Sequence, residues 1–139
     1  MADTQAIVAA IYTALTTDQT AGSFYDDVSG RIYEGQAHQN DTLPHCVYNV
    51  IVASQNLTHD TTDYDWLLQV DFYADAESSS MAALSAIENK AFDLLEKGAF
   101  SATGFDAVQV LCVTRGMRTI EEDAFRIMDE FRVQATVPA

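Results

Sequence analysis

The segment from Tyr64 to Phe72 restricts the fold more than any other part of the chain, because polar and apolar residues alternate along it. Successive side chains of a strand point to opposite faces, so the alternation predicts a strand with one buried face and one polar face. A polar second face is typical of antiparallel sheets. The buried face is expected to consist of Tyr64, Trp66, Leu68, Val70 and Phe72.

Further strands are expected before and after this segment. Pro44 opens a run to Ala53 that is apolar at nearly every position, which indicates a strand covered on both faces and joined to the next in a hairpin. Alternation also predicts a third strand from Val108 to about residue 116 and a fourth over residues 125–137. Asp129 falls on the apolar face of the fourth strand, so we expect a bulge or an edge position there.

Two helices are predicted from apolar residues spaced three and four positions apart. The first covers Asp3 to Thr17, and the second runs from an N-cap at Asp75 or Ser78 to about Lys97. The chain is therefore expected to be one α+β domain over residues 1–139, in the order α-β-β-α-β-β, with two helices packed on one side of a mostly antiparallel sheet. The second helix is expected to pack on the sheet through Leu84, Ile87, Ala91, Leu94 and Leu95.

A long polar tract at about residues 18–44 separates the first helix from the first strand and is expected to be a loop. Loops of this length usually carry function or become ordered on a partner. Aromatic and arginine residues are enriched at interface hot spots. The tract is thus a candidate assembly interface, expected to be mobile in the free subunit. The alternative is that its aromatic residues simply anchor it to the core of the same domain. The candidate interface residues are Phe24, Tyr25, Arg31, Ile32 and Tyr33.

The charge balance excludes one class of function. The chain has 21 acidic and 7 basic residues, for a net charge of −14. Such a surface repels phosphate, which argues against tight or sequence-specific binding of nucleic acid. The apolar runs are too short to span a membrane and the N-terminus lacks a basic segment before an apolar stretch, so we expect the chain to fold in a cytoplasm.

No pattern in the sequence predicts catalysis, a cofactor or a metal. His38, His45 and His59 lack the close spacing of metal ligands. The two cysteines, Cys46 and Cys112, are expected to be buried small apolar residues. The clustered acids, among them Asp71, Asp75, 121–123 and 129–130, are expected to be solvated charges and not a buried catalytic pair. The chain is therefore expected not to be an enzyme.

Four short segments, taken in order, carry a resemblance to a known family. They are Ser-Gly-Arg-Ile-Tyr at 29–33, Leu-Pro-His-Cys-Val-Tyr at 43–48, Leu-Gln-Val-Asp-Phe-Tyr-Ala-Asp at 68–75, and Asp-Glu-Phe-Arg-Val at 129–133. With the opening helix, this arrangement resembles the small tail-completion or tail-terminator proteins of long-tailed phages and prophages, which join head and tail. The resemblance extends over nearly the whole chain.

The resemblance implies a structural virion protein in the neck region of the tail, assembled in the host cytoplasm. The expected role is a subunit of a ring, with six copies, that terminates the tail tube and joins it to the head connector. Its partners would be other copies of itself, the tail tube protein and the connector or neck protein, while DNA passes through the lumen without sequence-specific binding. The alternative is a small α+β ligand-binding or dimeric regulatory module that is not an enzyme.

Overall fold

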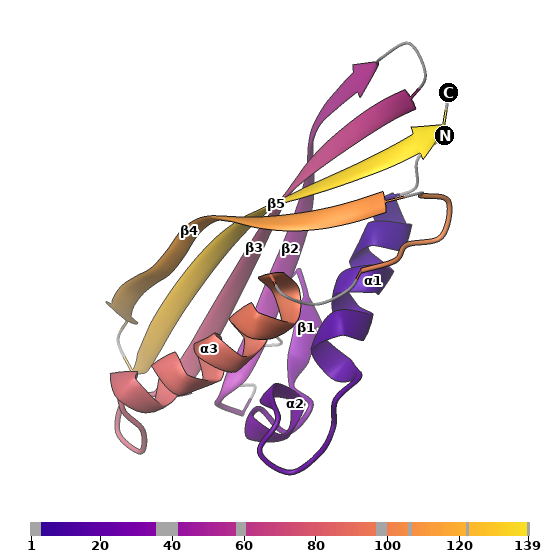
Figure 1. Cartoon of the computed structure of the whole chain (residues 1–139). Helices are drawn as coiled ribbons and strands as arrows, with labels where there is room; N and C mark the ends of the chain where they lie inside the picture. The colour runs from indigo at the N-terminus through magenta and orange to yellow at the C-terminus, as the bar shows by residue number, and fades with distance from the viewer. Residues whose placement is uncertain are drawn as a thin grey trace.

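The computed structural model describes residues 4–35, 42–57, 61–96, 100–105, 107–121 and 123–138. These residues form an α+β fold (Figure 1). The elements in chain order are α1 (Thr4–Thr16), α2 (Phe24–Asp27), β1 (Ile32–Glu34), β2 (His45–Leu57), β3 (Thr61–Asp75), α3 (Met81–Glu96), β4 (Ala107–Glu121) and β5 (Ala124–Pro138).

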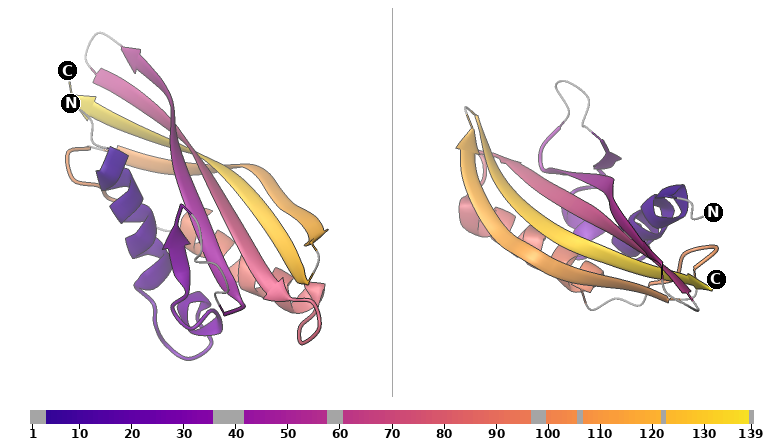
Figure 2. Two further views of the ribbon diagram at one scale, coloured as in Figure 1. Left: turned by 180° about the vertical axis from the view of Figure 1, so that it is seen from behind. Right: turned by 90° about the horizontal axis from the view of Figure 1, so that it is seen from above.

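The strands form one five-stranded sheet in the order β1-β2-β3-β5-β4. β1 is parallel to β2, and every other neighbouring pair is antiparallel, so the prediction of a mostly antiparallel sheet is confirmed. The helices of the described residues lie on one face of the sheet, and the sheet itself is long and twisted (Figure 2). The opposite face, called the open face below, carries no helix.

The tract at about 18–44 is not simply a loop, because it contains α2 and β1. Ser23 caps α2 by accepting a hydrogen bond from the Asp26 amide at 3.2 Å, and Phe24 enters the core with 1% of its surface exposed. β1 is fixed to β2, where the Cys46 amide donates to the Arg31 carbonyl oxygen at 2.9 Å. The predicted order α-β-β-α-β-β therefore omits one short helix and one short strand. Residues 36–41 of the tract lie outside the described residues.

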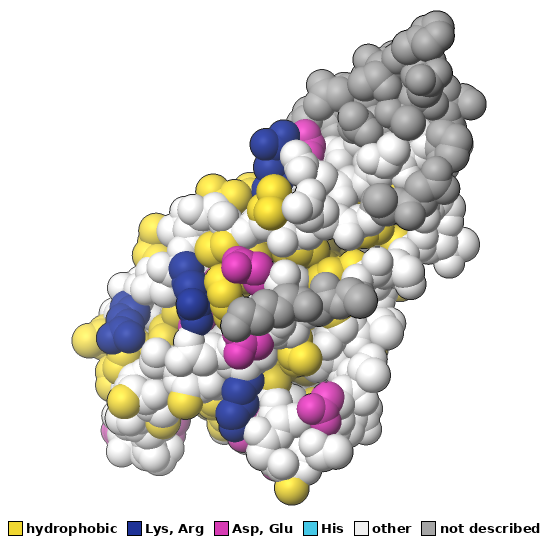
Figure 3. Space-filling view, in the orientation of Figure 1, with side chains coloured by type: hydrophobic (Ala, Val, Ile, Leu, Met, Phe, Trp, Pro, Cys, Tyr) yellow, Lys and Arg dark blue, Asp and Glu magenta, His cyan; other side chains and the backbone are white. Residues whose placement is uncertain are grey.

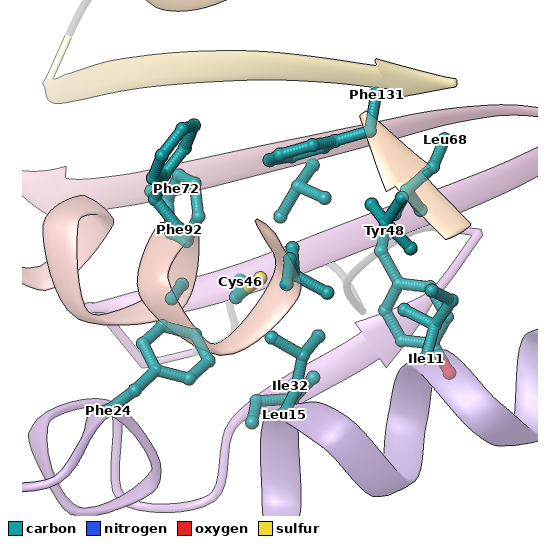
Figure 4. Packing of buried hydrophobic residues seen from close by; sticks show 14 of the residues in the cluster. Ile11, Leu15, Phe24, Ile32, Cys46, Tyr48, Leu68, Phe72, Phe92 and Phe131 are labelled. Carbon is teal, nitrogen blue, oxygen red and sulfur yellow. The ribbon is translucent and has the colours of Figure 1, made fainter. Parts of the chain in front are cut away.

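The core lies between the sheet and the helices (Figure 4). As predicted, the apolar face of β3 is buried, with Trp66, Leu68, Val70 and Phe72 at most 1% exposed. In α3, Leu84, Ala91 and Leu95 are fully buried, whereas Ile87 and Leu94 are partly buried against the same cluster. α1 contributes Ile7, Val8, Ile11 and Leu15.

Two strand predictions need correction. β2 was predicted to be covered on both faces, but Ile51 on its open face is 54% exposed, because the helices cover only the other face. β4 continues past residue 116 to Glu121, and its pairing with β5 shifts twice, once at Val113 and once in a bulge in which Arg115 and Gly116 lie opposite the single residue Asp129. The bulge is thus at the predicted level of the sheet, but in the partner strand.

Candidate functional site

The five candidate interface residues fall into two groups. Phe24 and Ile32 belong to the core, with 1% and 6% exposure, and Phe24 packs edge-to-face on the ring of Phe72 at 5.9 Å. These two side chains are therefore not available to a partner. Tyr25, Arg31 and Tyr33 are half-buried and keep part of their surface open.

The half-buried residues hold the tract against its own domain. Arg31 donates from Nε to the Pro44 carbonyl oxygen at 3.0 Å, which ties the start of β1 to the start of β2. The ring of Tyr25 lies directly over Gly30. Tyr33 lies on the open face, where its ring centroid is 5.9 Å from that of His45. The tract is therefore anchored locally, and its use as an interface stays a prediction for Tyr25, Arg31 and Tyr33.

The open face is crossed by ion pairs between β3 and β5. Arg126 contacts Asp71 at 2.7 Å, and Arg132 contacts Asp65 at 2.7 Å. Although no helix covers this face, Asp65 and Asp71 are only 5% and 4% exposed, since the arginine side chains lie beside them. The prediction that Asp71 is a solvated charge is therefore wrong. On this face, the two arginines therefore compensate the charges of Asp65 and Asp71.

A second acidic cluster lies inside the fold, where α3 meets the bulge of β4. Glu88 and Asp129 are 3% and 0% exposed. Arg115 donates to both oxygens of Glu88, at 3.0 and 3.2 Å, with its guanidinium 3.7 Å above the ring of Phe92. The Gly116 amide donates to Asp129 Oδ1 at 2.7 Å. The cluster therefore joins α3, β4 and β5, and the prediction that Asp129 is solvated is wrong.

The remaining oxygen of this cluster, Asp129 Oδ2, receives no hydrogen bond from any amide, guanidinium or hydroxyl group of the described residues. The Asp129 carboxyl group lies beside that of Glu88, and a hydrogen bond between two carboxyl groups needs one of them to be protonated. Burial, followed by this hydrogen bond and by the charge of Glu88, raises the pKa of Asp129 to about 8. The protonated form of Asp129 is therefore favoured at neutral pH.

The sequence contained a signal for this cluster. Glu88 lies on the buried stripe of α3, four positions after Leu84 and three before Ala91, and Asp129 interrupts the apolar face of β5. Each acid is thus at a position where the periodicity predicts burial. Their pairing was not visible, because 41 positions separate them in the chain.

The long edge of the sheet is the largest unpaired backbone surface of the described residues. β4 pairs only with β5, so its other side, 15 residues long, faces outward. Large apolar side chains are exposed along it, namely Leu111, Val113, Met117 and Ile120, at 40–72%. Figure 3 shows yellow apolar and dark-blue basic side chains side by side at the lower left, where Figure 1 draws the end of β4. A long, apolar edge strand is a template for pairing with another chain.

The pockets offer little for chemistry. The most prominent is a groove of about 720 Å³ between α1 and residues 100–103, lined mainly by small side chains such as Ala6, Ala10 and Ala14. None of its lining residues is titratable.

Within the described ranges, no group of three or more histidine, cysteine or acidic residues is placed to hold a metal ion. Cys46 and Cys112 are free, and burial raises the pKa of both thiols. No helix in the described part of the chain has the length and apolar character to cross a membrane.

Comparison with known proteins gives a fold likeness without a sequence match. No family model matches the chain, and no curated protein matches it. Among solved structures, the chain is similar to one from the virion of a native gene transfer agent particle, with a TM-score of 0.72, 16% identity and 96% coverage of both chains. A second solved chain, described by nothing beyond a sequence identifier, has a TM-score of 0.64 and 14% identity, with 97% of this chain and 96% of that one covered. At these identities the likeness establishes a shared fold over the whole chain.

Proposed function

We propose that the chain is a structural virion protein of a phage-like particle, a subunit of the ring that terminates the tail tube and joins it to the head connector. The observation that carries this proposal is the fold likeness, over 96% of both chains, to a chain of a gene transfer agent virion. The resemblance of four sequence segments to tail-completion proteins supports the same function independently, because it was based on residues and not on the fold.

The shape of the sheet supports a ring. A ring needs a head-to-tail contact between two different surfaces of the same subunit, repeated until the rotation closes. The sheet has two unlike edges, β4 on one side and β1 with the rest of β2 on the other. β1 pairs with only three residues of the 13-residue β2, so both edges leave backbone for a neighbour.

The charges suit a channel that DNA passes without binding. The net charge of −14 repels phosphate, and tight binding to DNA needs several basic contacts with phosphates. Most arginines of the described residues are already paired with acids, as in Arg115–Glu88, Arg126–Asp71 and Arg132–Asp65. Few cations are therefore left to hold a phosphate backbone.

Beyond its own copies, the ring would contact the tail tube protein and the connector or neck protein. We assign one of these contacts to Tyr25, Arg31 and Tyr33, which belong to the tract of α2 and β1 and keep part of their surface open. A half-buried aromatic or arginine side chain binds a partner at low entropic cost, because its own domain already restricts its rotamers.

The test is to inactivate the gene in a strain that produces the particles and to examine the lysate by electron microscopy. Filled heads and tails that are separate, with joining restored by the purified protein, are expected. In parallel, native mass spectrometry of the purified protein should find a closed ring, with six copies expected. Normal joined particles without the protein, or a purified protein that stays a dimer at every concentration, would contradict the proposal and favour a regulatory module.

A further inference from the structure

The end of β4 carries an arginine that has no acidic partner among the described residues. Arg118 contacts Ser85 Oγ at 3.5 Å and forms no ion pair with the described residues, although the chain has 21 acidic residues. Met117 and Ile120 beside it are 49% and 72% exposed. An arginine flanked by exposed apolar side chains on a free strand edge is the composition of an interface hot spot.

The opposite edge of the sheet presents an acid in the same way. Glu34, at the end of β1, is exposed and forms no ion pair within the described part of the chain. Tyr12 of α1 is 46% exposed. Glu34 and Tyr12 are both close enough to Tyr48 to help burial raise the pKa of its hydroxyl group to about 12. This edge of the sheet therefore presents an exposed acid.

The two edges correspond in level and in face. The pairing across the sheet runs in one row through Ile32, Cys46, Phe72, Ile127 and Arg118. Arg118 and Ile32 are thus at the same height on opposite edges, and Glu34 is two residues further along β1. Strand side chains two residues apart share a face, so Glu34 points to the helix-bearing face, as Arg118 does through its contact with Ser85 of α3.

The strand directions also fit. Between the two edges the chain direction reverses three times, from β2 to β3, β5 and β4, while β1 is parallel to β2. β1 and β4 of one subunit therefore run in opposite directions. A copy rotated about an axis along the strands brings its β1 antiparallel to β4 of its neighbour, which is the favourable direction for pairing.

The charge distribution along the sequence favours a second copy as the partner. The first 89 residues contain 13 of the 21 acidic residues and a single basic one, Arg31, whereas the last 50 residues contain the other six basic residues. The part of the chain that forms β1 is therefore strongly acidic, whereas most of the cations that could pair with it lie in the part that forms β4 and β5. Complementary patches set the register and orientation of an interface.

We propose that the end of β4 in one copy docks antiparallel on the β1 edge of a second copy, with Arg118 paired to Glu34. This contact rests on the proposed ring function, because it joins unlike edges and repeats from copy to copy. Arg118 and Glu34 are diagonal neighbours in this arrangement, at a distance that long side chains bridge.

A charge exchange tests the contact. Ring formation of the purified protein is measured by native mass spectrometry and light scattering for wild type, Arg118→Glu, Glu34→Arg and the double variant. Each single variant places like charges opposite each other and should raise the concentration for half assembly at least about tenfold, whereas the double variant restores the pair and should recover most of this loss. Glu77→Arg, an equal charge change at another exposed position, is the matched control and should assemble like wild type.

The outcomes separate the contact from the ring. Rings of unchanged stability in both single variants, or a double variant no better than the weaker single one, would overturn the contact and leave the ring intact. Wild-type protein that never forms rings would overturn both. Unfolding midpoints of all variants, measured below the assembly concentration, should agree with wild type, because neither side chain has an ion pair to lose within the described residues.

Discussion

The raised pKa of Asp129 predicts that the protein loses stability as the pH rises through neutrality. Asp129 has its pKa raised from 3.8 in the unfolded chain to about 8 in the fold. Between these values the folded state holds one proton that the unfolded state has released. The contribution of Asp129 to the free energy of unfolding should therefore be highest below pH 4. It should fall through neutral pH and level off above about pH 8.

The size of the effect follows from one proton. A difference of one bound proton changes the free energy of unfolding by roughly 1.4 kcal/mol for each pH unit. Between pH 5 and pH 7 the contribution of Asp129 should thus fall by roughly 2–3 kcal/mol. The buried position of Asp129, with 0% of its surface exposed, leaves little screening by solvent to reduce this figure.

The informative substitution is Asp129→Asn. The amide oxygen can still accept the hydrogen bond from the Gly116 amide, and the amide nitrogen can donate to Glu88 in place of the protonated Asp129 carboxyl group. Arg115, which donates to Glu88, keeps its partner. The variant should be about as stable as wild type at pH 5, more stable at pH 8, and nearly free of the slope between them.

The assay is urea unfolding at half-unit steps from pH 5 to pH 9, followed by fluorescence of the buried Trp66 and analysed as a two-state transition. Arg118→Glu serves as the background, so that assembly does not change the apparent stability. Asp71→Asn is the control, because it removes a buried carboxylate that is paired with Arg126 and should lower stability while keeping the wild-type slope. If the free energy of unfolding changes equally with pH in wild type and in Asp129→Asn, the raised pKa of Asp129 is refuted.

Three further predictions concern the core and the tract after α1. Phe72→Ala removes a fully buried ring that packs on Phe24 and should cost roughly 3–5 kcal/mol in denaturant unfolding, so a loss below about 1 kcal/mol would contradict its place in the core. Gly30→Ala should cost roughly 1–3 kcal/mol, because φ is +72° and the new Cβ would lie 2.8 Å from the Tyr25 hydroxyl oxygen; Gly35→Ala, with φ of +86° and no atom within 4 Å, should cost less. Tyr33→Ser should leave the unfolding midpoint nearly unchanged and weaken ring formation or tail joining, whereas a loss of several kcal/mol in the monomer would make the tract structural.

The long elements were predictable because each repeats its pattern often enough to define a face. α1 and α3 span 13 and 16 residues, and β3 spans 15, so several turns or alternations fix the buried side of each. α2 and β1, with four and three residues, are too short for any period to be visible. What stabilises them is tertiary: Phe24 in the core, and the bonds from β1 to β2.

The buried acids show the same limit in the candidate site. Helical periodicity placed Glu88 on the inner face of α3, but a buried carboxylate is stable only with partners, and these come from β4 and β5. The general rarity of buried acids makes such a position hard to recognise from the sequence alone. Similarly, nothing local in the sequence pairs Asp71 with Arg126 or Asp65 with Arg132, since 55 and 67 positions separate the partners.

The bulge shows how far a local signal reaches and where it stops. A polar residue on the apolar face of β5 marked the level of the irregularity at Asp129, and the register of β4 and β5 does shift opposite it. A bulge, however, belongs to a pair of strands, and the strand that bends is the one with the residue that tolerates the distortion. Gly116 adopts a positive φ of 72°, which directs its amide to Asp129 Oδ1 at 2.7 Å. The glycine thus explains why the bulge lies in β4. At the same bulge Arg115 points inward to Glu88, and beyond it Arg118 lies at the free edge of the sheet.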